Sequence, residues 1–351
     1  MAGYRVAVIG ATGAVGRTML RVLEERRFPV DTLRVTATAR SAGRVVDFRG
    51  RPHTVEETTE ASFDGVQVAF CAGGDGATGQ FGRAAVSRGA VVIDNSSTYR
   101  MDPDVPLVVP EVNAHALRRH RGIIAVPNCC AITMVLPLAP LHAAVPIRRV
   151  VACTYQSVSG AGQENIDALL DQSQRFLASP DLLRGHPTAP EVERVAGSPM
   201  PVAFNAIPQW KWMPGGVTEE EQKIVQETKK IMEADVPVSV TTVRIPVVVG
   251  HLVALHVEFA GPFPVDRARA ALSVAPGVEV ADDPERGRFP TPLYATGHDA
   301  CLVGRLRSDP TVPSGLMLLA AADNLRKGAA LNAVQIAEVL VRDGLLTGAR
   351  A

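Results

Sequence analysis

The residues best suited to covalent chemistry are two adjacent cysteines, Cys129 and Cys130, in the segment GIIAVPNCCAITMVLPLAPL. A buried strand is predicted to end just before them, and an apolar helix to begin with them. A thiol in the first turn of a helix lies at the positive end of the helix dipole, which stabilises the nucleophilic thiolate. Cys129, beside Asn128, is therefore a candidate nucleophile for attack on an acyl carbonyl. The alternative is a core cysteine, as most cysteines beside apolar residues are.

A histidine that could exchange a proton with such a thiol lies in the segment VRIPVVVGHLVALHVEF. His251 follows Gly250 near a predicted strand end, and an imidazole takes up and releases protons near neutral pH. A purely structural histidine is the alternative. We interpret His256, inside the following strand, as a filler of the core or surface.

The amino-terminal segment VAVIGATGAVGRTML has the pattern of a phosphate-binding loop. A predicted strand runs into Gly10-x-x-Gly13-x-x-Gly16, and a helix follows. Glycines let the backbone turn tightly and approach a pyrophosphate, which the amides at the helix start then bind. The spacing differs from the usual G-x-G-x-x-G pattern, so a plain strand–turn–helix connection is the alternative.

The end of the second predicted strand discriminates between the two nicotinamide cofactors. NAD sites usually carry an acid there for the ribose 2′-hydroxyl, whereas NADP sites carry an arginine for the 2′-phosphate. Here the strand ends in Thr38, Ala39, Arg40 and Ser41, without an acid. A cation beside a hydroxyl suits a phosphate, which favours NADP. A solvated loop arginine is the alternative.

Composition and charge exclude several classes of protein. Lys and Arg total 36, as do Asp and Glu, and this zero net charge argues against nucleic-acid binding, which usually needs a basic surface. The five cysteines are odd in number and lack paired spacing, so we expect neither a disulfide framework nor a metal site. No apolar stretch approaches the roughly 20 residues of a membrane helix, and no secretory signal opens the sequence. We therefore expect a cytoplasmic protein.

The elements that must position these residues begin with a parallel sheet. In the first third of the chain, short β-rich runs alternate with helical stretches, which is typical of a mostly parallel sheet covered by helices. We predict strands over residues 5–10, 33–39, 66–70, 91–94 and 123–126, and helices over residues 15–27 and 78–88.

The pattern changes near residue 160. A helix over residues 163–177 leads into a segment rich in Pro, Gly and Arg, 179–216, which we interpret as an insertion or a long excursion over the surface. The sequence after residue 216 predicts an antiparallel or mixed sheet with helices. Its elements are a helix over 219–234, strands over 238–243, 251–259, 301–307 and 315–322, and a last amphipathic helix over 325–342 that packs back on the first domain. The predicted fold class is α/β, with a Rossmann-like parallel-sheet domain followed by an α+β domain.

Several segments together resemble the aspartate-β-semialdehyde dehydrogenase family. They are GATGAVG, DNSSTYRMDPDVPLVVPEVN, PNCC, TYQSVSGAG, EEEQK, RIPVVVGH and DNLRKGAALN, which follow in order over the whole chain. The resemblance implies an NADP-binding domain over residues 1–128, with a C-terminal helix over 324–345 packing back on it. Residues 129–323 would form a catalytic and dimerisation domain.

The resemblance also implies a reaction. A cysteine attacks the acyl phosphate of β-aspartyl phosphate, phosphate leaves, and NADPH reduces the thioester to the aldehyde, as in lysine, threonine and methionine biosynthesis. The implied partners are the small-molecule substrate, phosphate and a second copy in a homodimer, without nucleic acid or membrane.

Individual residues take roles from the same resemblance. Cys129 would be the nucleophile, His251 the acid/base catalyst, and Gln156 the residue that orients the substrate beside the thiol. Five residues would bind the substrate: Arg244 its α-carboxylate, Glu220 its ammonium group, Arg100 and Lys223 the phosphate, and Asn128 beside the thiol. The cofactor would be lined by Gly10, Thr12, Gly13, Ala14, Val15, Gly16, Arg40, Ser41, Ser159, Gly160 and Asn324. No metal ligand is implied.

The positions of Glu220 and Lys223 agree with their implied roles, whereas Cys130 and Leu252 differ from the residues that the family usually has. Glu220 and Lys223 are three apart on one predicted helix, so both project from one face; without the resemblance they would be interpreted as an exposed ion pair. The family usually has Ser or Thr after the nucleophile, where this chain has Cys130, and Ser after the histidine, where it has Leu252. Each departure removes a hydroxyl beside a catalytic residue and leaves the catalytic side chain in place.

Two other functions are compatible with the same residues. One is a related acyl-phosphate reductase, of the N-acetyl-γ-glutamyl-phosphate reductase type or from a specialised pathway. An acetylated amine has no charge and would not need Glu220. The other is a catalytically silent NADP-binding homologue, against which the joint presence of Cys129, Gln156 and His251 argues.

Overall fold

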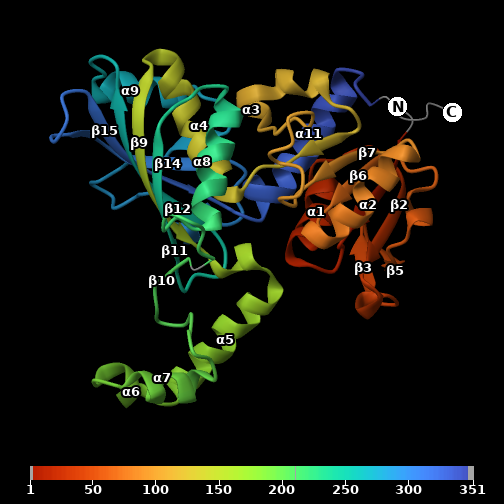
Figure 1. Ribbon diagram of the computed structural model, residues 1–351, viewed down its shortest axis with the longest axis horizontal. Coiled ribbons are helices and arrows are strands. Elements are labelled where there is room, and N and C mark those ends of the chain that lie inside the picture. The colour runs from red at the N-terminus through yellow and green to blue at the C-terminus, as the bar shows by residue number, and fades with distance from the viewer. Residues whose placement is uncertain (1–2, 210, 347–351) are drawn as a thin grey trace.

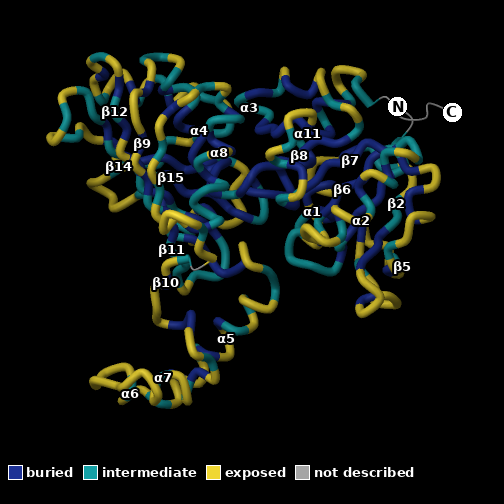
Figure 2. The backbone as a smooth tube through the Cα atoms, in the orientation of Figure 1, coloured by how far each residue is buried: buried dark blue, intermediate teal, exposed yellow. Residues whose placement is uncertain are grey.

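The computed structural model describes residues 3–209 and 211–346, which form two lobes and a projecting arm (Figure 1). The first lobe contains a parallel sheet from the first third of the chain, and the second contains a mixed sheet from the rest. Buried residues fill the centre of both lobes, whereas the far end of the arm is mostly exposed (Figure 2). None of the helices in the described ranges is both long enough and apolar enough to cross a membrane.

Six parallel strands form the first sheet, in the order β5-β2-β1-β6-β7-β8. Val8, Phe70 and Ile124 in this sheet are fully buried, as expected for parallel strands with helices on both faces. The strands are β1 (Tyr4–Ile9), β2 (Val30–Ala37), β5 (Glu56–Glu57), β6 (Val68–Cys71), β7 (Val91–Asp94) and β8 (Ile123–Ala125), and the helices against them include α1 (Ala14–Glu25), α2 (Asp75–Ser87) and α11 (Leu331–Arg342). The sheet confirms the predicted Rossmann-like class.

The second sheet is mixed, as predicted, with the strand order β10-β11-β9-β12-β15-β14-β13. Within it, β9 pairs in parallel with β11 and antiparallel with β12. The strands are β9 (Ile147–Gln156), β10 (Ile207–Pro208), β11 (Val238–Arg244), β12 (His251–Phe259), β13 (Val278–Val280), β14 (Cys301–Asp309) and β15 (Gly315–Ala322). The sequence prediction did not include β9, although it carries Gln156 into the site.

Helices α4 (Cys129–Ala144), α8 (Glu219–Met232) and α9 (Val265–Ser273) belong to the second lobe. The α4 helix packs against α8, α9 and four strands of the sheet, and every residue from Cys130 to Leu138 is buried. This part of the helix is apolar on nearly every side because no side of it meets water. Its first turn, which carries Cys129, therefore has a fixed position.

The arm is more regular than the sequence indicated. Residues 179–216 were predicted as an excursion with little periodicity, yet they contain two short helices and β10. Leu169, Phe176, Ala196 and Val202 form a small core within the arm. Its helices are α5 (Gln163–Leu177), α6 (Pro180–Arg184) and α7 (Ala189–Ala196).

The last helix differs from its prediction at its start. Residues Arg326–Ala330 form a π-helical turn, η5, and the α-helix α11 begins at Leu331. Arg26, at the end of α1, donates hydrogen bonds of 2.7 Å to both carboxylate oxygens of Glu338 on α11. The helix α11 thus lies against the first lobe.

The remaining elements are short. They are the hairpin β3 (Val45–Phe48) and β4 (Arg51–Thr54), the helices α3 (Pro110–Asn113) and α10 (Pro292–Ala295), and the 3-10 helices η1 (Ala39–Ser41), η2 (Glu60–Phe63), η3 (Ala114–Arg119) and η4 (Val158–Ala161).

Candidate active site

Cys129 is the first residue of α4, as the sequence predicted. Asn128 caps this helix, because its side-chain oxygen accepts the amide of Cys130 at 2.8 Å and that of Ala131 at 3.4 Å. The thiol therefore lies at the positive end of a 16-residue helix. It is partly exposed, whereas the neighbouring Cys130 thiol is fully buried.

The two thiols differ in acidity. A hydrogen bond from Cys130 and the nearby His251 and Arg100 hold the pKa of Cys129 well below its usual value, although burial opposes them. Burial, together with the charge on Cys129, raises the pKa of Cys130. Cys129 is therefore the thiolate of the pair, and Cys130 remains a thiol that donates towards it.

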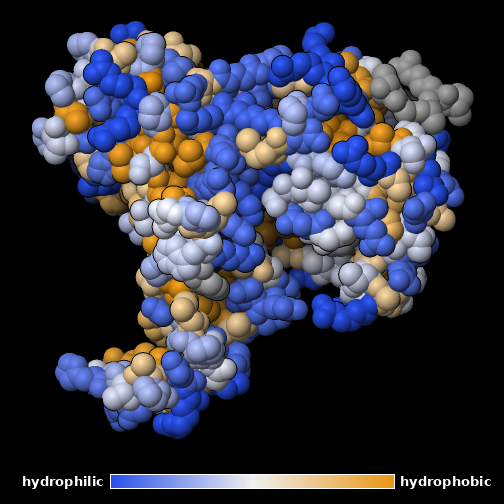
Figure 3. Space-filling view, in the orientation of Figure 1, coloured by the Kyte–Doolittle hydropathy of each residue, from blue (hydrophilic) through white to orange (hydrophobic). Residues whose placement is uncertain are grey.

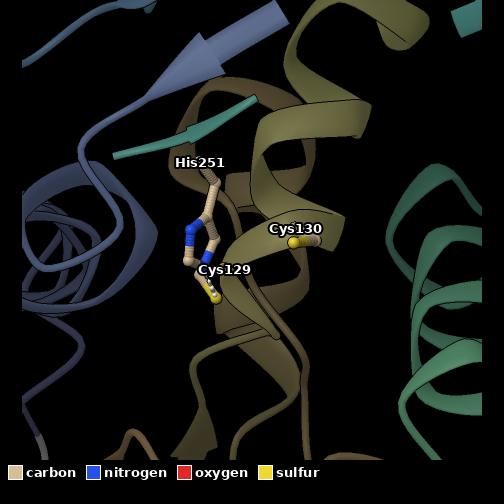
Figure 4. A group of neighbouring side chains, drawn as sticks. All are labelled: Cys129, Cys130 and His251. Atoms are coloured by element: carbon tan, nitrogen blue, oxygen red, sulfur yellow. Dashed lines mark hydrogen bonds between the residues drawn. The ribbon is translucent and has the colours of Figure 1, made fainter. Parts of the chain in front are cut away.

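His251 opens β12 and points at the nucleophile (Figure 4). Its Nε2 lies 3.1 Å from Cys129 Sγ, and the ring is fully buried. Its Nδ1 accepts the backbone amide of Ser157 at 3.0 Å. An amide only donates, so the neutral ring carries its proton on Nε2, facing the sulfur.

Sγ of Cys129, Sγ of Cys130 and Nε2 of His251 lie within 4.8 Å of one another, a spacing that three ligands of a metal ion could have. A tetrahedral metal ion at about 2.0 Å from a nitrogen and about 2.3 Å from a sulfur would hold these two ligand atoms about 3.5 Å apart. His251 Nε2 and Cys129 Sγ lie 3.1 Å apart, at hydrogen-bond distance, so this pair favours a shared proton over a metal ion.

Glu220, Asn128 and Gln156 meet beside the nucleophile. Glu220 Oε1 accepts Asn128 Nδ2 at 2.9 Å and Gln156 Nε2 at 3.1 Å. Gln156, at the end of β9, also accepts Gln209 Nε2 on its own side-chain oxygen at 3.1 Å. Three residues that the sequence named for substrate binding and orientation thus form one network.

Arg100 lies in the same region, but three of its N–H groups already have hydrogen-bond acceptors within the protein. Its guanidinium donates to Glu227 at 3.1 Å, to the carbonyl of Val126 at 2.9 Å and to the carbonyl of Asn95 at 3.0 Å. The Arg100–Glu227 ion pair is almost entirely buried. Three of the five N–H groups are used, and two remain for a ligand.

Lys223 and Arg100 lie close enough to Asp75 to act on it together. Burial alone would raise the pKa of the Asp75 carboxyl. Hydrogen bonds from Ser97 and the charges of Lys223 and Arg100 lower the pKa by more than burial raises it, so it lies below its usual value. Two cations predicted to bind phosphate therefore act on one region of the site.

A pocket of about 700 Å³ opens beside this network. Glu220, Lys223, Arg244 and Gly160 are among its lining residues, which confirms that Glu220 and Lys223 project from one face of α8. Cys129 and His251 do not line this pocket. Gly160 connects them to it, because a Cβ there would lie 3.2 Å from His251 Nε2 and 3.3 Å from Arg244 Nη1.

The glycine loop between β1 and α1 fits a dinucleotide. Gly10 has a φ of 77°, and a Cβ on Gly16 would lie 2.1 Å from the carbonyl of Gly10, so only glycine allows this turn. Gly13 caps α1 without a side-chain bond, and no acid stands in its first turn. The amides of the first turn, which includes Ala14, Val15 and Gly16, are therefore free for a pyrophosphate. Thr12 belongs to the same loop.

Residues predicted to bind the cofactor from the two lobes lie near one another. Arg17 of α1 donates to Gln163, the first residue of α5, at 2.5 Å. Arg40 on η1 lies 3.8 Å from Glu164 in an exposed ion pair, and Ser41 beside it is buried. Ser159 and Gly160 lie in the turn just before α5.

Asn324 links that turn to the histidine. Its side-chain amide donates to Ser159 Oγ at 2.9 Å, and its oxygen accepts Ser157 Oγ at 3.0 Å and the amide of Gly250 at 2.8 Å. A residue predicted only for the cofactor therefore also belongs to the surroundings of His251.

Sequence reasoning did not identify two residues of this network. Glu227 accepts the amide of Asn128 at 2.5 Å, and it lies seven residues after Glu220, so a helical pattern placed both on one face. Ser157 contacts His251 through its amide and its hydroxyl. In the sequence, the only indication of a role for Ser157 was its position between Gln156 and Ser159.

Known proteins match the whole chain. The semialdehyde dehydrogenase NAD binding domain model matches residues 5–120, and the semialdehyde dehydrogenase dimerisation domain model matches residues 138–327. Aspartate-semialdehyde dehydrogenase of Aquifex aeolicus is 45% identical over 98% of this chain and 100% of its own length. That of Legionella pneumophila is 46% identical over 97% and 96%.

A solved structure agrees with these matches. Aspartate semialdehyde dehydrogenase II of Vibrio cholerae, complexed with ASA, superposes with a TM-score of 0.89 and is 43% identical, covering 98% of this chain and 99% of that one. With a nicotinamide-dinucleotide-binding lobe on one side and the paired thiol and imidazole on the other, the chain belongs to the aspartate-semialdehyde dehydrogenase family of oxidoreductases.

Proposed function

We propose that this chain catalyses the NADPH-dependent reductive dephosphorylation of L-β-aspartyl phosphate to L-aspartate-β-semialdehyde through a thioester on Cys129, as in lysine, threonine and methionine biosynthesis. The observation that carries the proposal is the 3.1 Å contact between Cys129 Sγ and His251 Nε2 at the start of α4. A low-pKa thiol paired with an imidazole is the arrangement that acyl transfer requires.

In the first step, the Cys129 thiolate attacks the acyl carbon. The carbon–oxygen bond to the phosphoryl group breaks, and phosphate leaves towards Arg100 and Lys223. Gln156 and Asn128 hold the acyl group beside the sulfur, and the positive end of the α4 dipole favours the charge that develops there.

In the second step, the thioester carbon is reduced; NADPH, held against the glycine loop and the turn of Ser159 and Gly160, would supply the hydride. His251 gives the proton on Nε2 to the resulting oxygen and takes it back as the carbon–sulfur bond breaks. The aldehyde is released, and Cys129 returns as thiolate. Gly160 lies beside His251 Nε2, at the junction of the cofactor turn and the substrate pocket.

Substrate identity rests on Arg244 and Glu220. A free amino acid presents a carboxylate and an ammonium group close together. Arg244 binds the carboxylate and Glu220 the ammonium. Arg244→Lys keeps the charge but loses the planar fork, so we expect KM for aspartate semialdehyde to rise about ten-fold or more with little change in kcat.

Glu220→Gln separates the proposed substrate from its N-acetylated relative. With phosphate and NADP, we expect the wild type to oxidise aspartate semialdehyde and to prefer it over N-acetylglutamate semialdehyde. The substitution should weaken use of the free amine and leave use of the N-acetylated compound no worse. Faster wild-type turnover of the N-acetylated compound would refute the aspartate assignment and leave the thioester mechanism standing.

Cofactor preference provides a separate prediction. We assign the 2′-phosphate of NADP to Arg40 and Ser41, and the nicotinamide end to Ser159, Gly160 and Asn324. Arg40→Ala should lower kcat/KM for NADP by about 10- to 100-fold, the scale of a hydrogen bond to a charged group, while kcat/KM for NAD barely changes. Arg51→Ala, an exposed arginine on the hairpin, is the control. Equal use of both cofactors by the wild type would remove the assignment.

The partner we propose is a second copy of the chain. Helices cover one face of the mixed sheet, and the other face carries apolar residues that stay partly exposed, among them Val151, Cys153, Tyr155, Ala254 and Leu319. Figure 3 shows apolar residues gathered on the lobe that holds this sheet. Two such faces can pack on each other about a two-fold axis. Residues 129–323 would thus provide catalysis and the dimer contact, and residues 1–128, with the helix over 324–345, would bind NADP.

A further inference from the structure

The hydroxyl of Ser157 has a position that the proposed mechanism has not used. Ser157 Oγ lies 3.1 Å from His251 Nδ1, and both residues are fully buried. The amide of the same residue lies 3.0 Å from the same nitrogen. Within residues 3–209 and 211–346, these two groups of Ser157 are the hydrogen-bond partners of Nδ1.

The two groups favour different protonation states of the ring. The amide can only donate, so it stabilises the neutral ring with a bare Nδ1 and a proton on Nε2. A ring in that state has no free electron pair facing Cys129 or a substrate. To exchange protons at Nε2, the ring must carry its second proton on Nδ1 throughout the cycle.

A proton on Nδ1 needs an acceptor, because an unpaired buried N–H is costly. Ser157 Oγ can accept it only if its own proton points elsewhere. Asn324 Oδ1 lies 3.0 Å from that hydroxyl and is held in place by the amide of Gly250 at 2.8 Å. The hydroxyl proton of Ser157 can therefore point at Asn324 Oδ1, which leaves an electron pair of Oγ for the ring. The chain of contacts is Cys129 Sγ, His251, Ser157 Oγ and Asn324.

We propose that Ser157 is a positioning residue whose hydroxyl, oriented by Asn324, accepts the Nδ1 proton of the His251 imidazolium and so keeps the Cys129–His251 pair in its thiolate–imidazolium form. The proposal deepens the proposed function and rests on it only for the identity of the reaction. Protons balance: the proton on Nε2 moves to the substrate oxygen and back, while the proton on Nδ1 stays on the hydrogen bond to Ser157.

Other charged and titratable groups surround the pair without taking this role. Arg244 lies beside Gly160 at the Nε2 side of the ring. Asp323, the neighbour of Asn324, is occupied by the backbone amides of Leu325 and Arg326 and, on its other oxygen, Gly297. The groups on the sulfur side are Cys130, Arg100 and Glu220. Each of these would be unchanged in a Ser157 variant.

The test compares wild type, Ser157→Ala and Ser157→Thr in the rate at which iodoacetamide alkylates Cys129 as a function of pH, without substrate or cofactor. Ser157→Ala keeps the amide and removes only the hydroxyl. We expect the pH at which Cys129 becomes reactive to rise by about one unit, a ten-fold loss of thiolate below that pH. In turnover, kcat should fall about 10- to 100-fold with KM little changed. Ser157→Thr should restore both.

Nitrogen NMR of the His251 ring supplies a second measurement. In Ser157→Ala, the signal of a protonated Nδ1 should be lost at a pH where the wild type shows it. Ser62→Ala, a buried serine of the first lobe, is the matched control and should change neither measurement. Identical alkylation profiles and ring spectra for wild type and a folded Ser157→Ala would overturn the inference.

Failure of the proposed function and failure of the Ser157 inference give different results. If the wild type does not turn over aspartate semialdehyde but Ser157→Ala shifts the alkylation profile, the proposed substrate fails and the Ser157 inference stands. If turnover is as proposed and the profile does not move, only the Ser157 inference fails.

Discussion

Replacing Cys129 by Ser is expected to abolish turnover, by roughly a thousand-fold or more, which is the scale of a lost catalytic nucleophile. An alcohol is a far weaker nucleophile than a thiolate, and the contacts that lower the pKa of this thiol do not make a serine hydroxyl anionic near neutral pH. NADP binding, measured by calorimetry, should survive because the glycine loop lies on β1 and α1. Retention of a tenth of the wild-type kcat would mean that Cys129 does not form the thioester.

Cys130→Ser is the matched control for this substitution. Cys130 is buried, and its raised pKa keeps it protonated as a donor towards Cys129. A serine hydroxyl supplies the same donor in nearly the same volume, so we expect a change of only a few-fold in kcat. A loss as large as that of Cys129→Ser would mean that the wrong thiol has been assigned.

His251→Asn is expected to lower kcat by about 10²- to 10⁴-fold with KM little changed, as for a lost acid/base group. An amide cannot take and return a proton near neutral pH, and Cys129 also loses its partner at 3.1 Å. Alkylation of Cys129 near neutral pH should slow in the same variant, which separates loss of the ion pair from loss of substrate binding.

His115→Asn is the control for the histidine substitution. His115 is exposed and pairs with Glu233, away from the contacts of the site, and its replacement should leave kcat within a factor of about two. If His251→Asn changed only KM, His251 would be a binding residue, and the acid/base role would have to move to another group.

The parts of the fold that could be predicted from the sequence are those in which a strong local signal coincides with the final contacts. The glycine loop, the start of α4 at Cys129 and the i, i+3 pair on α8 are examples, because each depends on a few consecutive residues. Strand β9 was missed for a physical reason. Its residues Val151, Cys153 and Tyr155 face the open side of the sheet and are themselves largely apolar, so the usual alternation of polar and apolar residues is absent.

The site followed from the sequence only in part. Cys129 and His251 were named individually, but their contact joins positions 122 residues apart and depends on how α4 packs under β12. The contact of Ser157 with His251 joins positions 94 apart, and no local pattern marks one hydroxyl in the run Ser157-Val158-Ser159 as the partner of a ring. In the arm, the capping box of Thr188 and Glu191 was a local signal for α7 that the abundance of Pro and Gly obscured.

The central claim, a thioester on Cys129, is tested most directly by mixing the enzyme with β-aspartyl phosphate in the absence of NADPH. Phosphate release and peptide mass spectrometry would be followed in the same samples. The account predicts release of one equivalent of phosphate per active site, together with an aspartyl group on the peptide that carries Cys129. No release without NADPH, or an acyl group found on another residue, would contradict it.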